Sequence, residues 1–412
     1  MNDIEGERAM YRTISLILKN LDESSMSHIQ YWMRNATLLQ NEALNYIKTV
    51  HKQEGIILRY NQVYHQLKNS KYYKNLASNI AQNTLKQVDS SISSLLKNNG
   101  EIADIKVHPN KLSPLIMTAS KTSQKDNGFY IPISKSYKET VKHIKPIKIP
   151  YPPIIEVNKI KEIKLISLTN GEVFEVQFVH EVAQNPQDGY KHILGIDVGV
   201  DNFIAAATER GESFLIDGKR LKHIIYQHNK KVRNYKKHPI TNQDREQITK
   251  LNLKFKHQIK DYVYKSAKMT IDEAKQLEVG LILIGHNANI KSGTNIGKNN
   301  LMFQSFPYRQ LRKQLKSLCE LNGIEYLERE ESYTSKASFF DNDPIPTYGE
   351  ETEKYEFNGK RIYRGLYKSK SGLIINSDIN GALNIIRKSN LIDMSILQDE
   401  GWMAHPKRLY VN

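Results

Sequence analysis

Cysteine is nearly absent from this sequence, because Cys319 is the only one among 412 residues. A single thiol cannot form a disulfide within the chain, and a zinc site with cysteine ligands is excluded by count. Long apolar runs are also missing, since no stretch approaches the roughly 18 residues that a membrane-spanning helix needs. The first twenty residues place charges before a short alternating stretch, unlike a signal peptide. We therefore expect a soluble, cytoplasmic protein that does not contact a membrane.

Acidic residues are scarce relative to basic ones. The chain has 44 Asp and Glu against 60 Lys and Arg, which gives a formal net charge of +16. The excess is spread along the whole sequence and predicts a polyanionic partner, because neutralising phosphates releases counterions and drives binding. The alternative is a protein whose helices simply expose lysine-rich faces. The 23 tyrosines fit either interpretation, since a phenol ring stacks on bases or lines a core.

The first half of the chain alternates between two kinds of pattern. Residues 10–18 alternate apolar and polar side chains like a strand, and three stretches with helical spacing follow. Short strands interrupted by prolines come next, and Asn170-Gly171 between two alternating runs predicts a hairpin. We therefore predict a small β-barrel or curled sheet from residues 1–21 and 126–185, a helical unit over 22–99 and a connector over 100–125.

From Lys191 onward the order of predicted elements changes. Three successive strands read as an antiparallel meander, and a long helical stretch follows that is rich in lysine and is broken near His238-Pro239. Then come a strand, a helix, another strand and a short helix. This order is typical of the ribonuclease H fold, which is an α/β architecture. We predict such a domain over residues 186–412, with a basic helical insertion over 219–277.

Aspartates at the ends of these elements are the candidate catalytic residues. Asp197 lies in an otherwise apolar strand, where an unpaired carboxylate is costly to bury, and Gly195 and Gly199 leave room for a phosphate backbone. Magnesium ions held by such carboxylates clamp the attacking water and the leaving oxygen of a phosphodiester. The alternative is a turn cap for Asp197 and a helix N-cap for Asp378. Asp201 is expected to be a turn residue.

Two motifs resemble those of a known family. The segment GIDVGVDNFIAAA (195–207) and the segment SDINGALNIIRK (377–388) resemble the first and third RuvC motifs of the TnpB, or OrfB, proteins. These are RNA-guided nucleases encoded by insertion sequences and related to the type V CRISPR effectors and to Fanzor proteins. The resemblance runs nearly end to end, and it implies that Asp197 and Asp378 hold the metal ions.

The sequence departs from the family pattern at two places. Gly285 stands where most relatives carry a catalytic glutamate. The segment 335–350 replaces a four-cysteine zinc ribbon, so no zinc is expected; whether Asp341 and Asp343 do more there than shape a turn stays open.

In Fanzor proteins and some TnpB subgroups the glutamate comes instead from the strand before a Thr-Ser motif, a position that here is Glu331. Strand alternation sends Glu330 to the other face, although a bulge would exchange the two. Both glutamates being solvent-facing charge is the remaining alternative.

The resemblance implies an RNA-guided DNA endonuclease that hydrolyses DNA with Mg²⁺, or Mn²⁺ as a substitute, at Asp197, Glu331 and Asp378. It implies a monomer with one guide RNA derived from the transposon end, acting on double-stranded target DNA. The helical unit and a wedge-like barrel would read a short flanking motif, with Gln82 and Asn83 as candidate contacts. Two alternatives are an RNA-guided repressor without nuclease activity, which Gly285 favours, and a transposase that joins DNA strands.

Overall fold

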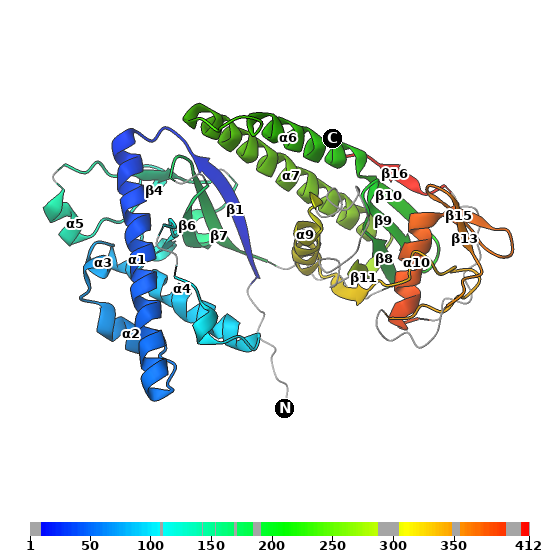
Figure 1. Cartoon of the computed structure of the whole chain (residues 1–412), viewed down its shortest axis with the longest axis horizontal. Helices are drawn as coiled ribbons and strands as arrows, with labels where there is room; N and C mark the ends of the chain where they lie inside the picture. The colour runs from blue at the N-terminus through cyan, green and yellow to red at the C-terminus, as the bar shows by residue number, and fades with distance from the viewer. Residues whose placement is uncertain are drawn as a thin grey trace. The chain divides into compact units, whose positions relative to one another are not determined.

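The computed structural model describes most of the chain, namely residues 10–107, 110–141, 143–152, 154–168, 171–183, 191–286, 305–347, 355–392 and 405–411. The chain divides into two compact units, Met1–Ala183 and Gln184–Asn412, and each is described by itself (Figure 1). Within the described ranges, every helix is too short or too polar to cross a bilayer.

The first unit is built on two antiparallel sheets. One has the order β1-β7-β6-β2 and the other β3-β4-β5, and Phe129 of β4 lies 6.2 Å from Phe178 of β7 between ring centroids. We expected a barrel or a curled sheet; the described strands form two sheets on a common core. The strands are β1 (Met10–Leu18), β2 (Leu115–Thr118), β3 (Gln124–Lys125), β4 (Gly128–Tyr130), β5 (Lys148–Pro150), β6 (Ile160–Ser167) and β7 (Phe174–Val182).

Helices pack against these sheets. The longest, α1 (Glu23–Glu54), begins at Asp22, whose carboxylate accepts from Ser25 N, and ends at Gly55 with a φ of 70°, a conformation that glycine adopts without strain. Trp32 and other apolar side chains on one face of α1 are buried. The other helices are α2 (Tyr60–Leu67), α3 (Lys71–Lys74), α4 (Ser78–Lys97) and α5 (Lys135–Thr140), and short 3-10 turns lie at η1 (Ile102–Asp104), η2 (Ala119–Lys121) and η3 (Val157–Lys159).

The second unit contains a six-stranded sheet in the order β12-β11-β8-β9-β10-β16. Strands β8, β9 and β10 form an antiparallel meander, and β11 and β12 run parallel to β8. This is the ribonuclease H arrangement that the order of elements predicts. The strands are β8 (His192–Asp197), β9 (Asn202–Thr208), β10 (Ser213–Asp217), β11 (Val279–His286), β12 (Glu325–Glu330) and β16 (Lys407–Leu409).

Helices cover both faces of this sheet, as Figure 1 shows. On one face, α6 (Lys219–Tyr235), α7 (Asn242–Gln276) and α9 (Tyr308–Asn322) share a core with the sheet, and the buried Cys319 lies in it. On the other face, α10 (Ser377–Ser389) packs over the central strands. The break between α6 and α7 includes His238-Pro239, as predicted. A small sheet of β13 (Lys360–Tyr363), β14 (Leu366–Lys368) and β15 (Ile374–Asn376) leads into α10.

Candidate active site

The three predicted carboxylates come from elements that meet at one end of the sheet. Asp197 is the last residue of β8, Glu331 directly follows β12, and Asp378 lies in the first turn of α10. Strand β11 separates β8 from β12 and runs parallel to both. Since parallel strands end at the same edge of a sheet, Asp197 and Glu331 lie on either side of the end of β11.

The Glu331 side chain crosses this gap over Gly285. Gly285 pairs with Arg329 of β12, and its neighbour Ile284 pairs with Ile196 of β8. A Cβ atom at Gly285 would collide with Glu331 Oε2. The carboxylate therefore occupies the space that a side chain at 285 would fill.

The neighbouring Glu330 is engaged elsewhere. Its carboxylate accepts from Lys388 Nζ and from Ser332 N, the latter at 2.8 Å. Burial acts to raise the pKa of Glu330, but the hydrogen bonds from Lys388 and Ser332 outweigh it and leave the pKa below its ordinary value. Lys388 also donates to the backbone carbonyls of Ser332 and Pro346. Glu330 thus serves as an anchor between β12 and α10.

Asp378 is free of the capping role that its position at the start of a helix would favour. The N-cap of α10 is Asn376, whose side chain accepts from Asp378 N and Ile379 N. The Asp378 carboxylate instead accepts from Asn202 Nδ2 at 2.7 Å, and it lies 3.6 Å from the Arg361 guanidinium. Asn202 and Arg361 are functional candidates that the sequence reasoning missed. Asn202 lies 176 residues from Asp378, and Arg361 approaches it only because the small sheet folds back onto the start of α10.

The carboxylates repel one another through a poorly solvated region. Burial, followed by the charges of Glu331 and Asp378, raises the pKa of Asp197 well above its ordinary value. Burial also raises the pKa of Glu331 to about 7, although the Arg312 charge opposes the shift. Burial and the charges of Asp197 and Glu331 raise the pKa of Tyr308 as well. The site therefore favours a cation or protons, because Arg312 and Arg361 compensate its negative charges only in part.

The chemistry of the donors, carboxylate oxygens, is that of a site for a hard divalent cation. Within the described ranges, no group of three or more His, Cys, Asp or Glu side chains surrounds one point closely enough to hold a metal ion, and Asp378 is engaged with Asn202 and Arg361. Glu331 Oε2, however, is buried and has no hydrogen-bond partner among these residues. Carboxylate oxygens are the ligands that Mg²⁺ prefers, and a buried carboxylate oxygen without a donor is stabilised by a cation.

Two asparagines of α10 hold the loop that follows Glu331. Asn384 Nδ2 donates to the carbonyls of Thr334 and Ala337, and Asn380 donates to Ala337 O while accepting from Phe339 N. Thr334 Oγ1 donates back to Glu331 O at 2.9 Å. Asn380 and Asn384 are four residues apart, so they lie on one face of the helix. That spacing was the signal in the sequence that points to them.

Nearby residues have structural roles. Asp201 accepts from Lys222 Nζ at 3.1 Å and from Arg364, in the turn before β9. A Cβ atom at Gly195 would collide with Ala382 O, so this glycine allows α10 to pack closely on β8. We expected Gly195 to leave room for a phosphate backbone; in the structure, the contact with α10 is what requires glycine here. Gly199 lies in the tight turn, where a Cβ atom would approach Asn202 O to 2.8 Å.

The segment that replaces the zinc ribbon is held by polar contacts around Asp343. This aspartate is 2% exposed, and its carboxylate accepts from Ser338 N, Asn358 N and Asn358 Nδ2 at 2.7–3.1 Å. Arg387 donates to the carbonyls of Phe339 and Asp343. Asp341 accepts from Lys370 N at 2.8 Å. Both aspartates thus connect segments that are distant in the sequence.

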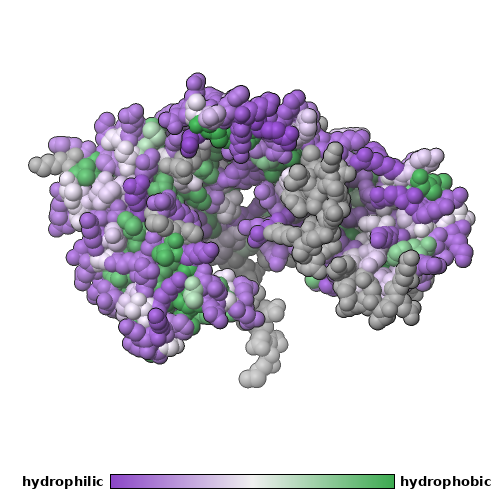
Figure 2. Space-filling view, viewed as in Figure 1, coloured by the Kyte–Doolittle hydropathy of each residue, from purple (hydrophilic) through white to green (hydrophobic). Residues whose placement is uncertain are grey.

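Basic side chains are exposed on α6 and α7, over which Figure 2 shows a mostly hydrophilic surface. The predicted basic residues of this stretch are all exposed, namely Lys230, Lys231, Arg233, Lys236, Lys237, Lys250, Lys254, Lys256, Lys260 and Lys265.

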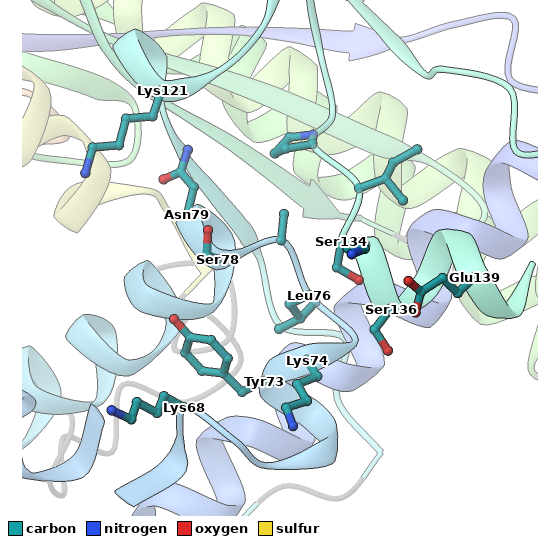
Figure 3. Close-up of a pocket in the computed structure, with 14 residues that line it drawn as sticks. Lys68, Tyr73, Lys74, Leu76, Ser78, Asn79, Lys121, Ser134, Ser136 and Glu139 are labelled. Atoms are coloured by element: carbon teal, nitrogen blue, oxygen red, sulfur yellow. The ribbon is translucent and has the colours of Figure 1, made fainter. Parts of the chain in front are cut away.

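The first unit has a lysine-lined pocket of about 680 Å³ (Figure 3). Lys68, Lys74, Lys121 and Lys135 line it beside Tyr73 and the start of α4. Two residues, Gln82 and Asn83, were predicted to contact the motif that flanks the target. The Gln82 side chain interacts with the Tyr73 hydroxyl, and Asn83 Nδ2 donates a hydrogen bond to Ile116 O at 3.1 Å.

Comparisons with known proteins match two segments of the chain to family models. Residues 175–291 match the family of OrfB_IS605 probable transposases, and residues 308–385 match the Cas12f1-like TNB domain. These two segments carry Asp197, Glu331 and Asp378, and they confirm the resemblance to the OrfB family. A comparison with curated protein sequences found no match.

Among solved structures, the chain resembles a Cas12f1–sgRNA–target DNA complex with a TM-score of 0.58 and 17% identity, over 89% of this chain and 83% of that one. This likeness shows a shared fold. A CRISPR-Cas12f ternary complex has a TM-score of 0.36 and 18% identity over 88% and 81% of the two chains. The structure of the mini-RNA-guided endonuclease CRISPR-Cas_phi3 has a TM-score of 0.44 and 10% identity, over 94% of this chain and 93% of that one.

Proposed function

We propose that this protein is an RNA-guided DNA endonuclease of a transposable element, which hydrolyses phosphodiester bonds in a RuvC-type site. The observation that carries the proposal is the placement of Glu331. Its carboxylate reaches over Gly285 toward Asp197 from the strand next to the one that lacks the glutamate. A protein without nuclease activity has no physical need for two poorly solvated carboxylates, Asp197 and Glu331, beside a third at the same end of the sheet.

In this proposal Asp197, Glu331 and Asp378 hold Mg²⁺, or Mn²⁺ as a substitute. When bound, such ions activate water and stabilise the charge that develops on the phosphate. Asn202 orients Asp378 through its 2.7 Å hydrogen bond. Arg361 adds positive charge beside Asp378, and Lys388 holds Glu330 away from the site.

The proposed partners are a guide RNA from the transposon end and a double-stranded target DNA, bound by one copy of the protein. The fold shared with a protein solved as a complex with sgRNA and target DNA supports this, as does the net charge of +16. Base pairing with the guide would read the target, while the protein would read a short flank and the shape of the duplex.

We assign the protein's parts accordingly. Residues 1–21 and 126–185 would form the wedge, residues 22–99 the recognition unit, 100–125 a connector and 186–412 the nuclease domain, in which the basic insertion 219–277 contacts the heteroduplex. The lysine-lined pocket of the first unit would contact phosphates of the flanking duplex, because its four lysines form no ion pair with a carboxylate among the described residues.

The test is cleavage of a plasmid library by protein purified with its guide RNA in Mg²⁺, with a matched target beside randomised flanks. We expect Asp197→Ala and Glu331→Gln to bind the target but to lose cleavage by at least about a hundredfold. Glu330→Gln is the matched control, and it should retain most of the activity, since an amide still accepts from Lys388.

Other outcomes would identify the alternatives. A wild-type protein that binds the guided target but never cuts it would be a repressor. Products joined to a donor end in the absence of guide RNA would identify a strand-transfer transposase. Cleavage that persists in Asp197→Ala would show that the nuclease site lies elsewhere.

A further inference from the structure

We propose that Gly285 and Gly381 are positioning residues. Because each lacks a side chain, Gly285 leaves room for the Glu331 carboxylate and Gly381 leaves room for the Asp197 carboxylate. The inference rests on the proposed function, but it concerns how this chain seats a glutamate that comes from β12. Neither glycine touches the reacting atoms, and both act through the carboxylate beside them.

Gly285 is the buried, next-to-last residue of the central strand β11, where glycine is unfavourable. Its φ is not in the left-handed region, so the backbone does not require glycine, and glycine weakens a strand interior. A Cβ atom at this position would overlap Glu331 Oε2, approach Glu331 Cβ to 3.2 Å and approach Ile385 Cδ1 to 2.9 Å. The shortest of these contacts is with the Glu331 carboxylate, and Ile385 belongs to the packed core under α10. A side chain at 285 would therefore displace the Glu331 carboxylate and press on the core.

Gly381 leaves room for the Asp197 carboxylate in the same way. It lies inside α10, where replacing alanine by glycine costs about 1 kcal/mol of helix stability. Its φ is also outside the left-handed region. A Cβ atom there would lie 2.6 Å from Asp197 Oδ2 and 3.2 Å from Asp197 Cγ. Both glycines therefore reduce the stability of a regular element and leave room for a carboxylate.

Competition between positions 285 and 331 explains why β11 has a glycine near its end, where most relatives carry a glutamate. A side chain at 285 and the Glu331 carboxylate compete for one space, so a glutamate supplied by β12 requires the absence of a side chain on β11. The geometry thus links Gly285 and Glu331 as a pair. A carboxylate at 285 combined with a small residue at 331 would fill the same region from the other strand.

The experiment compares Gly285→Ala and Gly381→Ala with the wild-type protein. We would measure the melting temperature in EDTA, the rise in melting temperature during a Mn²⁺ titration, and guided cleavage as a function of Mg²⁺ concentration. Both variants should need about tenfold or more metal for half-maximal stabilisation and cleavage, which is typical when support of a metal ligand is removed. Gly285→Glu combined with Glu331→Ala should recover part of the metal response.

The control is Gly128→Ala, a glycine in a sheet of the first unit. A Cβ atom there would be similarly crowded, at 2.6 Å from Lys148 Cε and 2.8 Å from Ile149 O, but no carboxylate of the site is near in sequence or sheet. It should lower the melting temperature without changing the metal dependence.

Wild-type metal dependence in Gly285→Ala and Gly381→Ala would overturn the inference and leave the proposed function intact. A wild-type protein that neither cuts nor responds to metal would overturn the proposed function together with it.

Discussion

At the scale of single residues, Glu331 and Glu330 are adjacent in the chain and have opposite electrostatic surroundings. Glu331 is held beside Asp197 with an oxygen that lacks a donor. Glu330 accepts two hydrogen bonds, one of them from a lysine. The pKa of the first is raised and that of the second is lowered. Their effects on stability should therefore have opposite signs.

We predict that Glu331→Gln stabilises the metal-free protein at alkaline pH. The folded state keeps the Glu331 proton up to a pKa of about 7, whereas the unfolded chain releases it near 4.5. The free energy of unfolding of the wild type should therefore fall as pH rises between these values and stay low above them. At pH 8 in EDTA the variant should be more stable by on the order of 2 kcal/mol, and at pH 4 the two should be equal.

Denaturant unfolding at pH 4, 6 and 8 measures this difference, and Glu330→Gln is the matched comparison. Because its folded-state pKa is lowered, Glu330 adds stability that is present above its unfolded pKa and is lost as pH falls through the folded one. Its amide variant should be less stable than the wild type at pH 8. A Glu331→Gln protein that is also less stable at pH 8 would contradict the assigned environment.

The sequence identified Asp197 from its position at the end of an apolar strand, and the structure places it there. The choice of Glu331 over Glu330 rested on the resemblance to Fanzor proteins and on strand alternation. What separates them physically is Lys388, which lies 58 residues from Glu330. One partner of Asp378 is even more distant in the chain, since Asn202 lies 176 residues away. Such contacts have no local periodicity and become visible only in the folded chain.

At the scale of elements, long periodic segments were predictable and short ones were not. The strand Met10–Leu18 has the bounds that its alternation predicts, and the helical spacing expected over residues 22–99 appears there as α1, α2, α3 and α4. Strand β2, with four residues, is too short to show a period, and it lies in the segment interpreted as a connector. It is a strand because β6 pairs with it, which is a tertiary contact.

The segment in place of the zinc ribbon should depend on Asp343 for its stability. Three N–H groups converge on this buried carboxylate, and hydrogen bonds to charged groups each contribute about 1.5–3 kcal/mol. We predict that Asp343→Ala lowers the free energy of unfolding of the second unit by about 3 kcal/mol, because it leaves these donors without an acceptor.

Thermal denaturation with and without a zinc chelator measures the effect. The wild-type melting temperature should not change with the chelator, since no cysteine-ligated zinc is expected. Asp341→Ala is the control, because Asp341 accepts one backbone N–H and is only partly buried, so its cost should be smaller. A loss of stability on chelation would show that a metal supports this segment.

At the scale of the whole molecule, each unit has a core of its own. Their chemistry differs as well, because the three candidate carboxylates lie in the second unit, while the pocket of the first is lined by four lysines and one glutamate, Glu139. A ribonuclease H order of elements was predictable for the second unit. The pocket was not, because its lysines come from separate segments that only folding brings together.

We predict that the lysine-lined pocket binds phosphates of the duplex that flanks the target. The double variant Lys74→Gln with Lys121→Gln should weaken target binding by the guide-loaded protein by about tenfold near physiological salt. It should also reduce the slope of log K against log salt by about 0.9 for each phosphate that the variant no longer neutralises. The weakening should be the same for every flank sequence, because side chains that bind phosphates position the duplex and do not read bases.

Filter binding or fluorescence anisotropy between 50 and 200 mM salt gives both quantities. Lys161→Gln is the matched control, because Lys161 lies in the same unit and forms a 2.7 Å ion pair with Glu181; it should leave the slope unchanged. Weaker binding of guide RNA, with target affinity unaffected once the guide is loaded, would assign the pocket to the RNA. Unchanged salt slopes for both nucleic acids would exclude the pocket from phosphate binding. The net positive charge of the chain would then have to attract nucleic acid through other surfaces. The exposed lysines of α6 and α7 are the next of these to test.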